Sequence, residues 1–169
     1  MKSDLRVLFV HGLESGPSGQ KAVYLGERFR ALTPKMDTKS FAGSVDLQAQ
    51  ALRDFEPDVL VGSSFGGAVA VALLDRGAWR GPTLLLAPAA GYFGVTEALP
   101  PHVPILIVHG KDDNVVAIEG SRRLAKTGTP ALVQLVEVDD GHRLQTLVER
   151  DELAGYVRRV AALGGRARA

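Results

Sequence analysis

The residues best suited to chemistry in this sequence are a serine, an aspartate and a histidine that follow one another along the chain. Ser64 lies in the segment GSSFG (62–66), which fits the pattern G-x-S-x-G. A serine hydroxyl is a weak nucleophile unless a base removes its proton, and a carboxylate must hold that base in place. His142 can supply the base, and Asp112 or Asp113 the carboxylate. These residue types predict a serine that attacks a carbonyl group.

Such a centre needs a scaffold that brings distant segments together, and the apolar runs of the chain predict one. Five runs rich in valine, leucine and isoleucine are continuous rather than alternating, which is typical of parallel strands covered on both faces: 5–10, 57–62, 82–87, 103–110 and 131–138. Helical patterns occupy 18–32, 65–76, 117–126 and 142–162, and weaker patterns indicate a short strand at 36–43 and a helix near 45–54. This alternation predicts a three-layer α/β/α sandwich with a mostly parallel sheet of about five or six strands.

The carboxyl ends of the predicted strands are where a ligand site is expected in such a sheet. Ser64, Asp113 and His142 each follow one of the apolar runs, so one edge of the sheet carries all three. Each also has a purely structural alternative: a helix cap for Ser64, a solvated turn for Asp113 and an exposed helix-terminal position for His142. The helix-cap alternative for Ser64 does not explain why an acid and a histidine follow the other strands.

Four segments that each follow a predicted strand carry a family resemblance. They are FVHGLESGPSGQKA (9–22), VGSSFGGAVA (61–70), IVHGKDDNVV (107–116) and DDGH (139–142). In this order they resemble the α/β-hydrolase superfamily in its small form, and the likeness covers essentially the whole chain. The His-Gly, the serine- and proline-containing loop and the Lys-Ala of the first segment are similar to small YqiA-like esterases. The resemblance implies a minimal α/β-hydrolase fold without a lid domain.

The resemblance also implies roles for individual residues. Ser64 matches the nucleophile and His142 matches the base. In the segment H-G-x-x-D-x-x-V the acid falls on Asp113, and Asp112 remains the alternative.

An oxyanion hole and a substrate pocket are further implications of the resemblance. The backbone N–H groups of Leu13 and Phe65 match the two donors of the hole, although the first segment lacks the triple glycine of some lipases. The expected pocket wall is Leu13, Phe65, Pro88, Tyr92, Phe93, Val115 and Val116, which favours an apolar acyl group. Lys111 and Arg143 near the rim raise the hypothesis of an anionic leaving group, such as a coenzyme A thioester.

The remaining histidines and acids have other expected roles. His11 and His109 follow strands, and we expect them to hydrogen-bond loop backbone. His102 precedes its strand and therefore lies at the opposite edge of the sheet. Asp139 and Asp140 are expected to form a turn.

Length and composition limit the classes of function. The chain has 169 residues, a length that predicts one domain, which we expect over 1–163 with a frayed tail over 164–169. Its formal net charge is +1. The absence of cysteine excludes disulfides and thiol catalysis. No basic stripe indicates a nucleic-acid partner, and no apolar stretch approaches the roughly 20 residues that span a bilayer. We expect a cytoplasmic protein, and the sequence leaves its oligomeric state open.

The sequence thus predicts a serine hydrolase that cleaves a carboxylic ester or thioester of a small or medium apolar acyl group through an acyl-enzyme on Ser64. This chemistry needs a small-molecule substrate and no metal or organic cofactor. Two alternatives remain open. One is a non-catalytic binding or interaction module with the same fold, and the other is an amidase, peptidase or acyltransferase with the same three residues.

Overall fold

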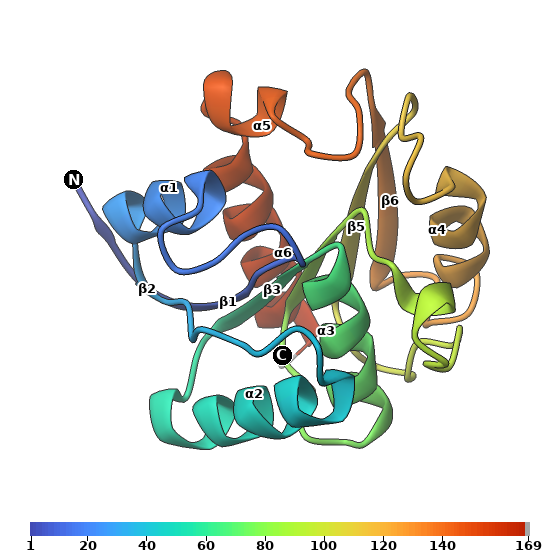
Figure 1. Cartoon of the computed structure of the whole chain (residues 1–169), viewed down its shortest axis with the longest axis horizontal. Coiled ribbons are helices and arrows are strands. Elements are labelled where there is room, and N and C mark those ends of the chain that lie inside the picture. Colours follow the sequence, from blue (N-terminus) through green and yellow to red (C-terminus); the bar gives the residue numbers. More distant parts are fainter. Residues whose placement is uncertain (168–169) are drawn as a thin grey trace.

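Six parallel strands form one sheet at the centre of the protein (Figure 1). The computed structural model describes residues 1–167. The strands are β1 (Ser3–Val10), β2 (Phe29–Leu32), β3 (Val59–Ser63), β4 (Thr83–Leu86), β5 (Ile105–Gly110) and β6 (Val133–Val138). Their order is β2-β1-β3-β4-β5-β6, and each neighbouring pair is parallel. The predicted α/β fold with a sheet of about five or six strands is confirmed.

Helices cover both faces of the sheet (Figure 1). One face packs against α1 (Gln20–Arg28), α5 (Thr146–Glu149) and α6 (Leu153–Ala167), and the other against α2 (Phe41–Phe55), α3 (Phe65–Asp75) and α4 (Ile118–Leu124). Along β1, Val7 and Phe9 belong to the first of these cores, whereas Leu8 and Val10 belong to the second. Because both faces of the central strands are buried, β3, β4, β5 and the second half of β1 are almost continuously apolar, whereas the edge strands β2 and β6 are only partly buried.

The winding of the chain reverses between β1 and β3. β2 lies on one side of β1 and β3 on the other, and the chain then proceeds in sequence from β3 to β6. Such a reversal leaves a crevice at the carboxyl ends of β1 and β3, where ligands bind in open α/β sheets. His11 follows β1 and Ser64 follows β3 at this place.

The prediction of one helix over 18–32 is wrong at its C-terminal end. α1 ends at Arg28, and Phe29–Leu32 form the edge strand β2. Pairing with β1 gives these residues the backbone partners that a longer helix would have given them, and it buries Phe29 completely. The strand pairing with β1 therefore outweighs the helical pattern of these residues, and periodicity alone does not reveal such a tertiary contact.

The strand predicted at 36–43 is also absent. This segment forms a turn and then the first residues of α2, where the Ser40 hydroxyl accepts a hydrogen bond from the N–H of Gly43. An N-cap of this kind favours a helix start at Phe41.

The single long helix predicted over 142–162 is divided in two. α5 covers four residues, and α6 begins at Leu153. Between them Asp151 adopts a left-handed conformation, with φ of 58°. Its carboxylate accepts hydrogen bonds from the Tyr24 hydroxyl and from Arg28, so contacts with α1 hold the break.

The C-terminal helix extends beyond residue 163, where we expected the domain to end. α6 continues to Ala167 and so includes most of the predicted tail, 164–169, while residues 168–169 lie outside the described part of the chain. Between β4 and β5 the regular structure consists of the 3-10 turn η1 (Ala90–Tyr92), and no lid domain occurs within residues 1–167. In the same residues, no helix combines the length and apolar character needed to cross a membrane.

Candidate active site

Ser64 occupies a sharp turn between β3 and α3. Its φ of 55° and ψ of −112° lie outside the common regions for a residue with a side chain, as in the strained turn that presents a nucleophile. Gly62 and Gly66 make this turn sterically possible. A Cβ at Gly66 would collide with the backbone carbonyl of Val10, and a Cβ at Gly62 would collide with the carbonyl of Gly66. The G-x-S-x-G pattern therefore has a local structural cause.

Replacement of Gly66 by alanine is expected to destabilise the protein by about 2–3 kcal/mol, because the new methyl group must displace the β1 backbone. Gly26 in α1 provides a matched control. A Cβ there meets no neighbour, so Gly26→Ala is expected to leave the free energy of unfolding unchanged or to raise it by up to about 1 kcal/mol. Urea unfolding of both variants measures the difference, and equal stabilities would contradict this account of the turn.

A continuous chain of hydrogen bonds connects Ser64, His142 and Asp113. The Ser64 Oγ lies 2.9 Å from His142 Nε2, and His142 Nδ1 lies 2.8 Å from Asp113 Oδ2. We assign the ring proton to Nδ1, which donates to the carboxylate, so that Nε2 accepts from the serine hydroxyl. The structure places Asp113 rather than the exposed Asp112 against the histidine.

The Asp113 carboxylate is completely buried and well supplied with donors. Its Oδ1 accepts hydrogen bonds from the backbone N–H groups of Val115 at 2.9 Å and Val116 at 2.8 Å. Burial acts to raise the pKa of Asp113, but the hydrogen bonds from Val116, His142 and Val115 outweigh it, and the pKa is lowered. The carboxylate is therefore ionised at neutral pH and can stabilise a positive charge on His142.

His109 supports the turn that carries Asp113. Its fully buried ring donates from Nε2 to the carbonyl of Val116 at 2.9 Å and accepts at Nδ1 from the Ser121 hydroxyl at 2.7 Å. The Nε2 atom also lies 3.0 Å from Asp113 Oδ2. These contacts to loop backbone and to α4 match the structural role expected for this histidine.

His11 holds the loop that follows β1. Its Nε2 accepts from the backbone N–H of Met36 at 3.2 Å, and its Nδ1 donates to the carbonyl of Gly12 at 2.8 Å. Because the C=O and N–H of a trans peptide point in opposite directions, the N–H of Leu13 points away from the His11 ring. Within residues 1–167, the N–H groups of Leu13 and Phe65 donate to no backbone carbonyl or side chain. Both N–H groups therefore lack a protein acceptor in this part of the chain.

Two residues to which the sequence analysis gave no role at the site hold the loop of His142, 139–145. Asp140 accepts hydrogen bonds from the N–H of Gly141 at 2.7 Å, and from the N–H and hydroxyl of Thr146 at 2.8 and 2.6 Å. Lys21 on α1 donates from Nζ to the backbone carbonyl of Arg143. His142 lies between these anchor points. The Lys-Ala of the first segment was the signal for Lys21, whereas Asp140 resembled an ordinary turn residue.

Substitution of Asp140 by asparagine is expected to lower kcat/KM by about tenfold, because hydrogen bonds to a charged carboxylate are each worth about 1.5–3 kcal/mol and their weakening loosens the His142 loop. Asp139→Asn is the control. Asp139 is exposed, and within the described residues its side chain hydrogen-bonds only to Lys111. Loss of its charge should therefore change kcat/KM by less than twofold. Similar losses in the two variants would contradict the anchoring role.

The same variant is expected to change the acid stability of the protein. Burial acts to raise the pKa of Asp140, but hydrogen bonds from Thr146 and Gly141 lower it below the ordinary value of 3.8. A lowered folded-state pKa stabilises the fold above the ordinary value, and this contribution disappears as the pH falls through the lowered pKa. The stability difference between wild type and Asp140→Asn should therefore be larger at pH 7 than near pH 3, as urea unfolding would measure. A constant difference would contradict the assignment.

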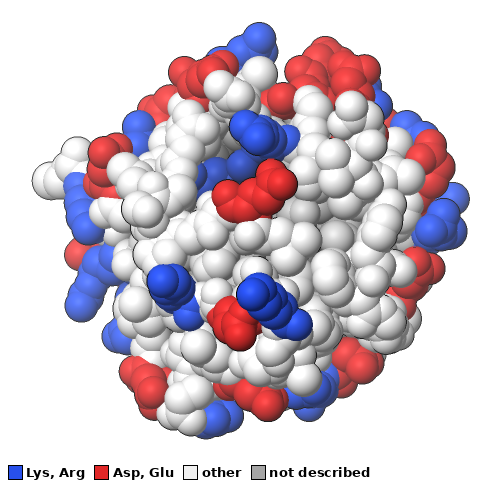
Figure 2. Space-filling view, in the orientation of Figure 1, with Lys and Arg blue, Asp and Glu red and all other residues white. Residues whose placement is uncertain are grey.

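A cavity of about 940 Å³ opens at Ser64 and His142. Figure 2 shows a hollow on this face of the molecule with basic and acidic side chains around it. The lining combines polar and apolar surface and comes from the ends of β1 and β3, the loops after β1, β3, β5 and β6, and the start of α1: Phe9, Gly12, Leu13, Glu14, Ser15, Gly19, Gln20, Lys21, Ser63, Ser64, Asn114, Val115, Asp140, Gly141, His142, Arg143 and Gln145. This volume suits a small molecule.

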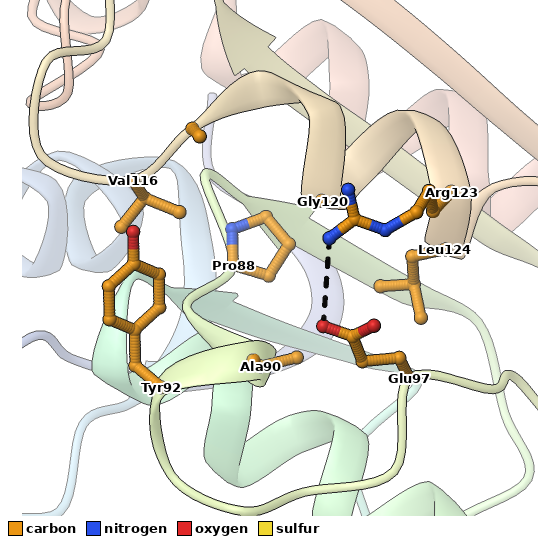
Figure 3. A pocket seen from close by; sticks show the side chains of 10 residues that line it. Pro88, Ala90, Tyr92, Glu97, Val116, Gly120, Arg123 and Leu124 are labelled. Carbon is orange, nitrogen blue, oxygen red and sulfur yellow. Dashed lines mark ion pairs between the residues drawn. The ribbon is translucent and has the colours of Figure 1, made fainter.

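Only part of the predicted pocket wall lines this cavity. Leu13 and Val115 do, but Tyr92 and Val116 line a separate cavity of about 180 Å³ beside Pro88, shown in Figure 3 with its Glu97–Arg123 ion pair. The Tyr92 hydroxyl donates to the Val115 carbonyl at 3.4 Å, between the two cavities.

Phe93 and Lys111 are likewise not on the wall of the Ser64 cavity. The Phe93 ring packs against Phe65 and Phe41, at centroid distances of 5.0 and 5.3 Å, and so supports the turn from behind. Phe65 itself is almost fully buried and offers only its backbone N–H. Lys111 pairs with Asp139 at 3.0 Å, outside the cavity lining. Across the described residues, no group of three or more His, Cys, Asp or Glu side chains could hold a metal ion.

Comparison with solved structures identifies the fold family. No protein-family model matches the chain, and no curated protein matches its sequence. A solved protein from Xanthomonas campestris pv. campestris, classed as a hydrolase of the alpha/beta superfamily, is 26% identical, with 96% of this chain and 98% of that chain covered and a TM-score of 0.68.

Two structures with lower sequence identity share the same fold. A thermophilic esterase from Thermogutta terrifontis is 16% identical over 95% of this chain and 92% of that chain, with a TM-score of 0.71. A monoacylglycerol lipase from Paleococcus ferrophilus is 13% identical over 94% of each chain, also with a TM-score of 0.71. The protein described here is a small member of the α/β-hydrolase superfamily by fold.

Proposed function

We propose that this small α/β hydrolase is a serine hydrolase that cleaves a carboxylic ester or thioester through an acyl-enzyme on Ser64. The observation that carries the proposal is the hydrogen-bonded chain from Ser64 through His142 to Asp113, which opens onto the larger cavity. The alpha/beta hydrolases with the same fold support hydrolysis as the general reaction. The narrower likeness to YqiA-like esterases stays a prediction.

Acyl transfer to the enzyme begins with proton transfer from Ser64 to His142 Nε2. The serine Oγ attacks the carbonyl carbon, and the imidazolium then gives the proton to the leaving alcohol or thiol as the C–O or C–S bond breaks. Asp113 stays ionised throughout and stabilises the imidazolium through Nδ1. Water repeats the same sequence on the acyl-enzyme and releases the acid with Ser64 restored.

The negative charge on the tetrahedral oxygen needs donors that are already in place. The N–H groups of Leu13 and Phe65 are our candidates, since neither donates to another protein group within residues 1–167. The His11 contact to Gly12 would keep the first of these donors in its orientation. One such donor is worth about 3–4 kcal/mol of transition-state stabilisation in other hydrolases.

The acyl group that this site would accept is small or medium in length. Leu13 and Val115 are the apolar side chains at the cavity mouth, and both are more than half exposed. They offer limited apolar area, which fits a short chain better than a long one. Cytoplasmic action on a small molecule remains part of the proposal.

The test is the turnover of an oxygen ester, a thioester and an amide that share one butanoyl group. We expect hydrolysis of the ester and thioester with kcat/KM at least about a hundredfold above that of the amide, because resonance stabilises the amide carbonyl and its nitrogen must be protonated before the C–N bond can break. Faster cleavage of the amide would favour an amidase or peptidase. Butanoyl transfer to an added alcohol in preference to water would favour an acyltransferase, and no turnover by folded protein would favour a non-catalytic binding module.

A further inference from the structure

Two basic side chains line the cavity that holds Ser64. Lys21 reaches it from the first turn of α1, and Arg143 reaches it from the residue after His142. The two are linked, because the Lys21 ammonium donates to the Arg143 backbone carbonyl. A cation from α1 and a cation from the His142 loop thus face one space beside the reactive serine.

Lys21 is held in a position that favours an anionic ligand. Burial disfavours the ammonium and is the main cause that lowers the pKa of Lys21; Asp140 opposes this effect, and Arg143 lowers the pKa further. An anion beside Lys21 would stabilise the charged form. An ammonium has three N–H donors, and within the described residues only the bond to the Arg143 carbonyl occupies one of them. A partly buried ammonium with donors to spare gains more from an anion than an exposed one does.

The acidic residues of the cavity do not neutralise these cations by direct contact. Asp140 directs its oxygens to Gly141 and Thr146, with no hydrogen bond to Lys21. Glu14 is 90% exposed and approaches the Arg143 guanidinium only at 4.0 Å, a distance at which an exposed pair is weak. An anion that enters the cavity can therefore bind both cations without breaking a hydrogen-bonded ion pair.

We propose that Lys21 and Arg143 form an anion-binding subsite beside Ser64, so that the preferred ester carries a carboxylate or phosphate group. The ammonium binds one oxygen as a compact charge, and the guanidinium can bind two oxygens in parallel. The reaction on this substrate rests on the proposed function, whereas binding of the anion does not.

The subsite differs from the one that the sequence suggested, in which Lys111 and Arg143 bind an anionic leaving group. Lys111, one of the two residues of that hypothesis, is paired with Asp139 and lies outside the cavity lining. Lys21, which replaces it, comes from a different element. Lys111 is therefore a matched control, a lysine near the same strand ends but without the proposed contact.

The kinetic test compares anionic and neutral esters within each variant. One pair places the carboxylate on the alcohol half, 3-carboxyphenyl acetate against phenyl acetate, and another on the acyl half, phenyl hydrogen adipate against phenyl hexanoate. 3-Phosphonooxyphenyl acetate distinguishes phosphate from carboxylate. In wild type the anionic member of at least one pair should have the higher kcat/KM.

The preference is expected to fall about tenfold in Lys21→Gln and about threefold in Arg143→Gln, and to persist in Lys21→Arg and Lys111→Gln. The ratio within one variant cancels any general loss of activity from a looser His142 loop. An unchanged ratio in both Lys21→Gln and Arg143→Gln would overturn the proposal.

A binding measurement makes the test independent of catalysis. In Ser64→Ala, titration calorimetry should show tighter binding of the anionic ester than of its neutral partner, and Lys21→Gln in the same background should remove the difference. Equal affinities of Ser64→Ala for the members of both pairs would overturn the subsite, even if neutral esters are hydrolysed. Tighter binding of the anion by protein that hydrolyses no ester would instead retain the subsite and reject the proposed function.

Discussion

Ser64→Ala is expected to lower kcat for an ester by about a million-fold, because it removes the oxygen atom that forms the acyl-enzyme in the proposed mechanism. Within residues 1–167 the hydroxyl has one hydrogen bond, to His142, so its loss should leave the turn and the neighbouring strands in place. The measurement is single-turnover hydrolysis of phenyl acetate, with thermal unfolding to verify that the variant is folded.

Ser63→Ala is the matched control for this variant. Ser63 is the neighbouring residue, lines the same cavity and makes no hydrogen bond to His142. Its substitution should lower kcat by no more than about tenfold. If Ser64→Ala retains more than a thousandth of the wild-type rate, or if Ser63→Ala is the more damaging change, Ser64 is not the nucleophile.

Asp113→Asn is expected to lower kcat by about ten-thousandfold, the size of the effect when a triad aspartate becomes asparagine in a characterised serine protease. The amide cannot hold a proton on His142 Nδ1 as the carboxylate does, and its N–H favours the wrong ring tautomer. The buried Oδ1 contacts to Val115 and Val116 can persist with an amide oxygen, so the turn should survive. Steady-state kinetics and urea unfolding together measure the two effects.

Asp112→Asn tests the alternative acid that the sequence left open. Asp112 is exposed and its side chain makes no hydrogen bond to His142 in the described residues, so this variant should keep kcat within about twofold of wild type. A larger loss in Asp112→Asn than in Asp113→Asn would reverse the assignment of the acid.

The sequence predicted the placement of these three residues because the relevant signals are local. The continuous apolar runs show where each buried strand ends, and in a parallel sheet those ends share one edge. The glycines around Ser64 reflect contacts with β1 and within the turn itself, so they appear as a short motif. Asp113 and His142 are far apart in sequence, but each follows directly on a strand of this sheet.

Features that depend on contacts between elements could not be predicted in the same way. Phe29 fits a helical stripe as well as it fits an edge strand, and only pairing with β1 decides. The division of the Tyr92 and Val115 neighbourhood into two cavities depends on how η1 packs against the β5 loop. Lys21 reaches the His142 loop from a segment that is 122 residues away in sequence.

The most direct test of the central claim is the intact mass of the protein after exposure to a fluorophosphonate, which reacts with serines activated by a neighbouring base. The account predicts one adduct on wild type, none on Ser64→Ala, and strongly slowed labelling of His142→Ala and Asp113→Asn. No adduct on folded wild type, under conditions that label a control serine hydrolase, or an adduct that persists in Ser64→Ala, would contradict it.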